Sequence, residues 1–394
     1  MEVILHLRGP ISMKNFTYLL ILVSFFGVSC GSAVPHIFSK KTPHEKYEDK
    51  LKDTGAANSP EGRMWLAASV KAVNAAQVIS VPYKLKGFFN SDKPRALGLS
   101  FTAKQGELVV FDLQKTEGLS MYADLFKING TEPTHILSAE TGALQFGLEV
   151  KETGTYVLRL QPEINAEGQY ELAVQAGPSL GFPVSGSKAR VGSVWGDSRD
   201  GGKRSHEGID IFAPKRTPVV AIADGYISAV RDGGLGGKTV NLRPTGSNYS
   251  LYYAHLDEQH VKEGQFVKKG EVLGLVGNTG NAKTTPPHLH FGIYSYGGAI
   301  DPLPFVNKVS KTPASIPQKE LAGNTLRLVK SHKTADGQTL KINSILTPLA
   351  ITPKGYLAED ELGNLHLAPF SSVKAVRTEP RTITARKGAD SKTL

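Results

Sequence analysis

The sequence predicts a mostly β protein, built as an N-terminal antiparallel β-sandwich, a central region and a small C-terminal β domain. The 394 residues include 41 Gly and 23 Pro, which favours short strands joined by turns over long helices. Apolar stretches with strand patterns recur between residues 78 and 174, and Gly, Asn, Asp or Pro fills most of the gaps between them. The chain is long enough for roughly two or three domains, each with its own core.

Composition excludes several classes of protein. A hydrophobic content of 40% and a charged content of 21% are typical of folded protein, which excludes a mostly disordered chain and a collagen-like fibre. Only one long apolar run exists, so a multi-span membrane protein is also excluded. The single cysteine, Cys30, excludes an intrachain disulfide and a multi-cysteine zinc site. The formal charge of +10 suits an anionic surface such as cell wall, membrane or nucleic acid.

Residues 1–29 are predicted to be a signal peptide. A basic residue, Lys14, precedes a mostly apolar run over residues 16–30, which is too short to span a membrane. Cys30 ends this run and resembles the cysteine of the bacterial lipoprotein box, although Gly27 stands where that box prefers Leu. We therefore expect export and a lipid anchor at Cys30. The alternative is an ordinary cleaved signal with an incidental cysteine.

The segment 30–60 is predicted to be a linker, because residues 36–59 are rich in charge and suit a solvated spacer. Ser59 and Pro60 are a typical helix start, and an apolar face follows them. That face consists of Trp65, Leu66, Val70 and Val73.

Residues 61–178 are predicted to form the β-sandwich domain. Its expected strands lie at residues 78–81, 97–101, 108–113, 144–150, 156–160 and 170–174. The phrases at residues 101–106, 154–158 and 168–172 resemble the bacterial pre-peptidase C-terminal domain family. No grouping of His, Asp or Glu here suggests chemistry, so we expect a spacer or binding domain.

The last third of the chain is expected to be structural. A linker is predicted over residues 307–324, with Lys, Thr and Pro at its centre. A small β domain of unknown role follows over residues 325–376, with short strands expected at 326–329, 340–342, 349–351 and 365–367. The basic tail, residues 377–394, is predicted to be mobile.

Three short phrases of the central region contain four of the eleven histidines. The phrases are residues 205–211, 252–256 and 286–292. His288 and His290 alternate with apolar residues, which is a strand pattern, so both imidazoles point to one face. Two adjacent imidazoles are costly to bury unused, and neutral imidazole is the commonest metal ligand.

A metal site can be assembled from two of these phrases. His206 and Asp210 lie four residues apart, but Gly208 and the β-branched residues beside it indicate an extended turn leading into a strand. With one imidazole from residues 286–292 they give the mixed ligand set typical of catalytic zinc, with a fourth position open for water. Because the chain has no thiolate cluster, zinc is favoured over iron–sulfur chemistry.

A water activated at such a site needs a group that takes its proton. His255 is available, as is whichever of His288 and His290 does not bind the metal. Glu207 is expected to be solvated, because in an extended segment its side chain alternates away from His206.

Residues 182–305 resemble the lysostaphin-type zinc metallopeptidase family, the peptidoglycan endopeptidases. The resemblance is carried by separate phrases in the family's order, together with its turn glycines. These phrases are residues 208–211, 213–214, 217–219, 223–225, 253–256, 261–265, 267–270, 277–280 and 288–292.

This resemblance implies roles for five residues. Zn²⁺ would be bound by His206, Asp210 and His290, while His255 and His288 would be the non-ligand catalytic histidines that activate water and stabilise the tetrahedral oxyanion. It also implies that residues 179–306 form a metallopeptidase domain, a mostly antiparallel β-sheet with an open groove for the substrate peptide. We expect the glycine-rich loop 231–238 to edge that groove.

The predicted function is an exported, zinc-dependent endopeptidase that hydrolyses peptide crosslinks of bacterial peptidoglycan through a metal-activated water. The alternative is a non-catalytic cell-wall-binding scaffold or amidase activator, as some relatives with lost ligands are, but all five residues are present here. Peptidoglycan peptides are the expected partners, and the expected location is the cell envelope, with a membrane anchor through Cys30. No nucleic-acid partner is expected, because the basic residues are spread along the chain without aromatic interleaving.

Overall fold

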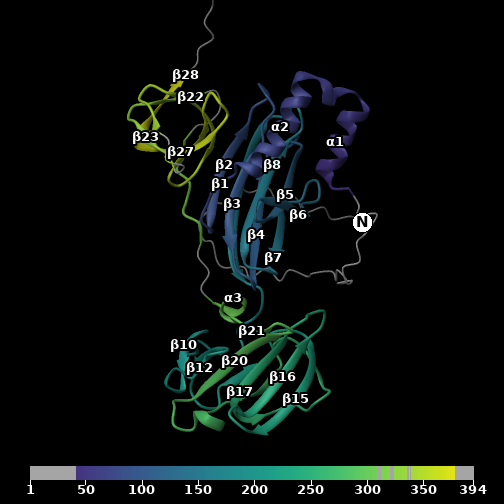
Figure 1. Cartoon of the computed structure of the whole chain (residues 1–394), viewed down its shortest axis with the longest axis vertical. Coiled ribbons are helices and arrows are strands. Elements are labelled where there is room, and N and C mark those ends of the chain that lie inside the picture. Colours follow the sequence, from purple (N-terminus) through teal and green to yellow (C-terminus); the bar gives the residue numbers. More distant parts are fainter. Residues whose placement is uncertain (1–40, 309–311, 320–323, 335–336, 338, 378–394) are drawn as a thin grey trace, which may run out of the picture. The chain divides into compact units, whose positions relative to one another are not determined.

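The computed structural model describes residues 41–308, 312–319, 324–334, 337 and 339–377 (Figure 1). Strands dominate this part of the chain, which confirms the mostly β prediction. The predicted signal peptide, the lipoprotein cysteine Cys30 and all but the first residue of the basic tail lie outside the described residues. Within the described residues, no helix is both long and apolar enough to cross a membrane.

Part of the predicted spacer is a packed helix, so the expectation of a solvated segment over residues 36–59 is wrong for these residues. Helix α1 (Pro43–Asp53) begins with a capping box between Thr42 and Glu45, and the 3-10 helix η1 (Ala56–Asn58) follows it. The charged residues of α1 cover its solvent side, while its residues His44, Tyr47 and Leu51 are buried. This spacing of three and four residues is a helical stripe within a polar sequence.

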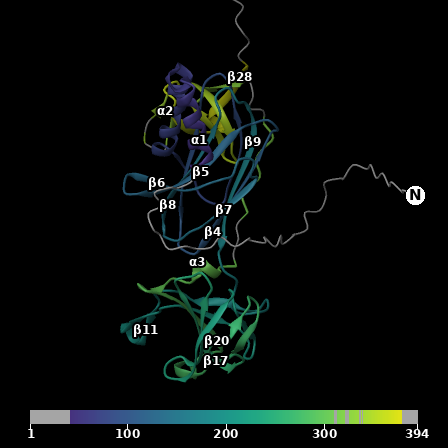
Figure 2. The same ribbon diagram turned by 90° about the vertical axis from the view of Figure 1, so that its right-hand side faces the viewer.

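The second helix begins where the sequence predicts. In α2 (Pro60–Asn74) the Ser59 side chain accepts a hydrogen bond from the Gly62 N–H, and Pro60 occupies the first turn. Trp65 is fully buried and its indole N–H donates to the Pro162 carbonyl. Val70, predicted to face the core, is exposed. The helices contact strands of the sandwich, α1 on β5 and α2 on β3 and β8 (Figure 2).

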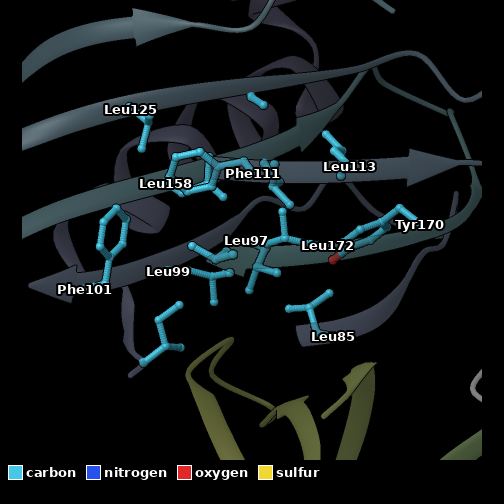
Figure 3. Packing of buried hydrophobic residues seen from close by; sticks show 14 of the residues in the cluster. Leu85, Leu97, Leu99, Phe101, Phe111, Leu113, Leu125, Leu158, Tyr170 and Leu172 are labelled. Carbon is cyan, nitrogen blue, oxygen red and sulfur yellow. The ribbon is translucent and has the colours of Figure 1, made fainter. Parts of the chain in front are cut away.

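Two sheets face each other around the sandwich core. One has the order β1-β3-β8-β5-β6. The other includes β2-β9-β4-β7. The strands are β1 (Gln77–Val78), β2 (Tyr83–Phe89), β3 (Leu97–Ala103), β4 (Glu107–Lys115), β5 (Met121–Asn129), β6 (Glu132–Ser138), β7 (Gln145–Glu149), β8 (Gly154–Pro162) and β9 (Gly168–Pro178). Figure 3 shows the side chains of both sheets meeting in one cluster, among them Leu99 and Leu158 from one and Phe111 and Leu172 from the other.

Three sandwich strands were not predicted from the sequence, each for a physical reason. Lysines alternate through the first half of β2, and β6 is exposed along most of its length, so neither shows a clear apolar pattern. Strand β5 carries a buried carboxylate, Asp124, whose charge is compensated by the Arg159 guanidinium at 2.7 Å. A tertiary ion pair of this kind leaves no local signal.

Strands of the C-terminal region continue the second sheet. Strand β25 pairs with β2 through Lys86 and Ile351, and the sheet continues as β26 and β27, while β22 pairs with β25 and β28. The strands are β22 (Asn324–Leu328), β23 (His332–Lys333), β24 (Thr339–Leu340), β25 (Ile345–Ile351), β26 (Gly355–Glu359), β27 (Leu365–Pro369) and β28 (Val373–Arg377), with the 3-10 helix η4 (Phe370–Ser372) before the last. The domain boundaries at residues 178, 306 and 324 stay predictions.

The central region has its own sheet and its own core. The sheet order is β10-β13-β20-β17-β16-β15-β18, with β14 paired to β19, β19 to β17 and β21 to β20. The elements are β10 (Arg190–Ser193), β11 (Ser198–Arg199), η2 (Asp200–Gly202), β12 (Arg204–Ser205), β13 (Ile209–Phe212), β14 (Pro218–Val220), β15 (Gly225–Gly233), β16 (Gly237–Pro244), β17 (Ser250–Gln259), β18 (Phe266–Val267), β19 (Val272–Val276), η3 (Gly280–Ala282), β20 (His288–Ser295), β21 (Gly298–Ile300) and α3 (Leu303–Val306). Ile209, Ile211, Leu289 and Phe291 are completely buried on one side of this sheet, which directs the alternate residues of β13 and β20 to the other.

Candidate functional site

The structure brings all five predicted site residues together on the sheet of the central region. Asp210 lies on β13, His255 on β17, and His288 and His290 on β20, while His206 lies between β12 and β13. These strands are neighbours: Asp210 stands opposite His290 on one side of β20, and Ala254 stands opposite it on the other. Because side chains alternate along a strand, this register places Asp210, His288 and His290 on the face opposite the core.

Three candidate ligand atoms converge on one point. Nε2 of His206 lies 3.0 Å from Oδ1 of Asp210 and 3.0 Å from Nδ1 of His290, and the last two atoms are 3.1 Å apart. Gly208 makes this approach possible, because a Cβ at that position would meet the His290 ring and the Phe291 carbonyl.

The protein fixes which atoms of this trio face inward. Nδ1 of His206 donates to the Val194 carbonyl at 2.8 Å, so its proton lies there and Nε2 carries the lone pair. Burial would by itself raise the pKa of Asp210, but its close contacts with His206 and His290 outweigh burial and hold that pKa well below its usual range. Asp210 is therefore ionised, and the convergent atoms are a carboxylate oxygen and imidazole nitrogens.

The trio fits a tetrahedral metal ion. Ligands bound at 2.0–2.2 Å in a tetrahedron lie about 3.4 Å from one another, close to the separations measured here. Among the described residues, these three are the group of His, Cys, Asp and Glu side chains with metal-binding geometry. Their facing atoms are all nitrogen and oxygen atoms that can bind a cation.

His255 and His288 flank this trio with matching hydrogen bonds. Nδ1 of His255 donates to the Thr279 carbonyl at 2.9 Å, and Nδ1 of His288 donates to the Pro286 carbonyl at 2.9 Å. In both rings Nε2 therefore carries the lone pair, and that of His288 lies 4.0 Å from Oδ1 of Asp210. The two ring centroids are 5.1 Å apart.

Burial decides the charge of His255. It lowers the pKa of this imidazole to about 4, with further lowering from the neighbouring His288 and His290. His255 is thus neutral near pH 7, as an acceptor of a proton must be.

An arginine that the sequence analysis did not single out completes the surroundings of Asp210. Nη2 of Arg199, on β11, donates to Oδ2 of Asp210 at 2.8 Å and to the Ser193 hydroxyl at 2.6 Å. This leaves Oδ1 as the carboxylate oxygen that faces the histidines. No sequence spacing connects β11 to β13, so only the fold could have identified it.

The site lies in a groove of about 1010 Å³. Its lining includes the five site residues together with Ser193, Arg199, Glu207, Asn241, Tyr252 and Tyr294. Glu207 is exposed, as expected of a solvated residue, although it also lines the groove. Leu235 and Gly236 of the glycine-rich loop stand at its edge, where the sequence analysis expects that loop.

The other histidines that the structure describes take no part in this cluster. His44 is buried and stacks on Trp65, and His366 is buried beside Asp360 at 2.9 Å. His135, His260 and His332 are not buried.

Comparisons with known proteins identify the region that holds the site. Residues 204–302 match the model of Peptidase family M23. An uncharacterized metalloprotease of Haemophilus influenzae is 40% identical over 139 residues, which are 33% of this chain and 28% of that protein. An L-Ala–D-Glu endopeptidase of Bacillus subtilis is 39% identical over 124 residues, which are 28% of this chain and 38% of that protein.

A further relative is similar over more of the chain. The uncharacterized lipoprotein YgeR of Escherichia coli is 26% identical over 256 residues, which are 62% of this chain and 96% of that protein. By contrast, the chain spans 28% and 38% of the lengths of the first two relatives.

Proposed function

We propose that this chain, whose residues 204–302 are a Peptidase family M23 domain, is a zinc-dependent endopeptidase of the cell envelope that hydrolyses peptide crosslinks of bacterial peptidoglycan. One observation carries the proposal. Two imidazole nitrogens and one carboxylate oxygen converge within about 3 Å of one another, beside two further histidines, in an open groove. A binding module needs no such set.

His206, Asp210 and His290 would hold the zinc ion, because their inward atoms are the nitrogen and oxygen donors that zinc prefers. When bound there, zinc supplies Lewis-acid chemistry: it polarises the scissile carbonyl and lowers the pKa of a water. Arg199 and the Val194 carbonyl hold Asp210 and His206 in their binding orientations.

His255 and His288 would carry the proton transfers. Each holds its own proton on Nδ1 against a backbone carbonyl, which leaves Nε2 able to accept a proton from the attacking water. Once protonated, the same nitrogen can donate to the oxyanion or to the leaving amine. Because the rings lie side by side, one can act as base while the other, when protonated on Nε2, stabilises the developing negative charge.

The relatives support a peptide substrate and a location in the cell envelope. The Bacillus subtilis relative is named for cleavage of a peptide bond of L-Ala and D-Glu, and the Escherichia coli relative is named a lipoprotein. Peptidoglycan as substrate agrees with the open groove, which can admit an extended peptide. The net charge of +10 favours retention on anionic wall polymers.

The test is hydrolysis of purified, crosslinked peptidoglycan by residues 31–394, with and without a chelator. We expect release of uncrosslinked muropeptides that a chelator abolishes and zinc restores. His290→Ala should lose both zinc and activity, whereas His288→Ala should retain zinc and lose activity. His260→Ala, an exposed histidine paired with Glu258, is the matched control and should behave as the unaltered protein. Absence of release together with absence of zinc would instead favour the scaffold.

A further inference from the structure

The segment 277–280 begins the connection between β19 and β20 and touches both non-ligand histidines. The Gly277 carbonyl accepts a hydrogen bond from the His288 N–H at 3.0 Å, and the Thr279 carbonyl accepts one from Nδ1 of His255 at 2.9 Å. Gly277 also packs directly on the backbone of β17, where a Cβ would meet the His255 carbonyl oxygen. One short segment thus sets positions on two different strands.

His255 needs external support because its backbone is strained. Its φ is +60°, in the left-handed region that residues other than glycine seldom adopt. The register with β16 shifts between the pairs Val240–Tyr253 and Lys238–Leu256, so two residues of β17 stand against one of β16. This is a β-bulge, a device that redirects a side chain beside a functional site. Such a conformation costs of order 1–3 kcal/mol and persists only where its surroundings enforce it.

The Thr279 side chain joins the two strands at this bulge. Its hydroxyl donates to the Leu256 carbonyl on β17 at 2.9 Å and accepts from the Lys238 N–H on β16 at 3.0 Å. The two strands cannot bond each other regularly here, because the bulge interrupts their ladder. A single hydroxyl therefore satisfies one donor and one acceptor that flank His255.

The glycine-rich loop closes around the same point. The His255 N–H donates to the Gly236 carbonyl at 2.9 Å, and the Asn281 N–H donates to the Leu235 carbonyl at 3.0 Å. Gly237 has a φ of +62° and packs against Thr279, where no Cβ could fit. The glycine-rich loop thus binds the backbone N–H of His255, and the Thr279 carbonyl binds its ring.

We propose that Thr279 is a positioning residue whose hydroxyl, by joining β16 to β17, holds its own carbonyl against Nδ1 of His255 and so aims Nε2 of that ring at the reacting atoms. The inference rests on the proposed function for the role of His255, but its structural part does not. It assigns to the segment 277–280 a task that neither the ligand set nor the substrate groove accounts for.

The test compares Thr279→Val, which removes the hydroxyl at nearly constant volume, with Thr279→Ser, which retains it. With a purified crosslinked muropeptide dimer as substrate, we expect Thr279→Val to lower kcat about 10- to 100-fold with KM nearly unchanged, since small displacements of a catalytic group cost that much. In Thr279→Ser, kcat should stay within about threefold of the unaltered protein by the same argument. Zinc content should be equal in all three proteins.

Thr217→Val is the matched control. Its hydroxyl also donates to a backbone carbonyl in the central region, that of Pro214 at 2.6 Å, but it touches none of the site histidines. Its kcat should match that of the unaltered protein. Equal losses in the two Val variants would overturn the proposal, because they would reflect general destabilisation.

A second readout does not depend on activity. In nitrogen-15 NMR spectra of the zinc-loaded protein, His255 should show its proton on Nδ1, assigned by loss of the signal in His255→Gln. Thr279→Val should broaden or shift that signal, while Thr279→Ser and Thr217→Val should leave it in place. An unchanged His255 signal in Thr279→Val would overturn the proposal. So would a His255 signal in Thr279→Ser that differs from that of the unaltered protein. If the unaltered protein cleaves no muropeptide, the proposed function fails and this spectrum alone decides the positioning role.

Discussion

Two regions of the molecule bury histidine in opposite ways. Around α1, Nε2 of His44 donates to Oε1 of Gln161 at 2.7 Å, and the Gln161 amide in turn donates to the Trp65 carbonyl. In the central region, Nε2 of His206, Nδ1 of His290 and Oδ1 of Asp210 lie 3.0–3.1 Å from one another. The first imidazole has a partner outside any ligand set, whereas the second group consists of potential metal ligands that face one another.

The difference shows how a structural histidine can be told from a candidate metal site. Burying a polar group costs little when it is hydrogen-bonded and far more when it is not. Around His44, hydrogen bonds within the protein compensate the burial. At Asp210, Arg199 compensates only the carboxylate oxygen Oδ2, so Oδ1 and the two imidazoles beside it need added protons or a cation. The contrast predicts that removing His44 lowers the stability of the fold but leaves catalysis intact. Removing a site histidine of the central region should lower catalysis but leave the stability of the fold intact.

The largest expected effect separates the two regions directly. His255→Ala should lower kcat on crosslinked muropeptides about 10²- to 10⁴-fold, the range for removal of a general acid or base, while zinc content stays the same. His44→Ala should leave kcat within about twofold, since that ring only packs and hydrogen-bonds in the sandwich, and should lower the thermal midpoint instead. Steady-state kinetics, metal analysis and calorimetry check the pair. Loss of activity in His44→Ala at a temperature where it is folded would erase the distinction.

A smaller effect is expected at Arg199, which touches Asp210 but not the other ligands. Arg199→Gln should weaken zinc binding about 10- to 100-fold, as removal of such outer partners of a metal ligand does. Competition with a chromogenic chelator measures the affinity without any substrate. Arg231→Gln is the matched control, because Arg231 pairs with Glu263 on the surface. Equal affinity in the Arg199 variant would mean that the contacts of Asp210 with His206 and His290 suffice to orient its carboxylate.

How much the sequence predicts depends on whether the determining contacts are local. Alternation along β20 placed His288 and His290 on one face, and the structure agrees, because strand periodicity is a local property. Arg199 contacts a residue 11 positions along the chain, and the hydroxyl of Thr279 contacts residues 23 and 41 positions away, and no local spacing pattern marks these contacts. The phrase at residues 277–280 carries part of the family resemblance, and the sequence assigns it no separate role. The role of the Thr279 hydroxyl depends on the bulge that interrupts the ladder between β16 and β17.

Helix α1 shows the opposite failure, in which the local composition was misleading. Its many charges suggested a solvated spacer, yet three buried side chains at helical spacing pack it onto the sandwich. Tyr47 contributes through both of its ends, with its ring against Trp65 and its hydroxyl accepting from the Ile164 N–H at 3.0 Å. A narrow stripe of this kind is outweighed in any average over composition.

The smallest predicted effect concerns pH and the stability of that helix. Burial lowers the pKa of His44, as does the nearby Arg159 cation, while the hydrogen bond to Gln161 and the carboxylates of Asp124 and Glu48 oppose the lowering only in part. Because the folded pKa lies below the unfolded value of about 6.5, the unfolded chain binds more protons, and stability falls as pH drops below about 6.5 until the folded pKa is reached. The slope from this group is at most about 1.4 kcal/mol per pH unit. His44→Gln keeps an amide donor without titrating, so its denaturation midpoint between pH 7 and pH 5 should depend on pH less steeply than that of the unaltered chain. Parallel curves for the two proteins would place the acid sensitivity elsewhere, in groups such as the Asp360–His366 pair.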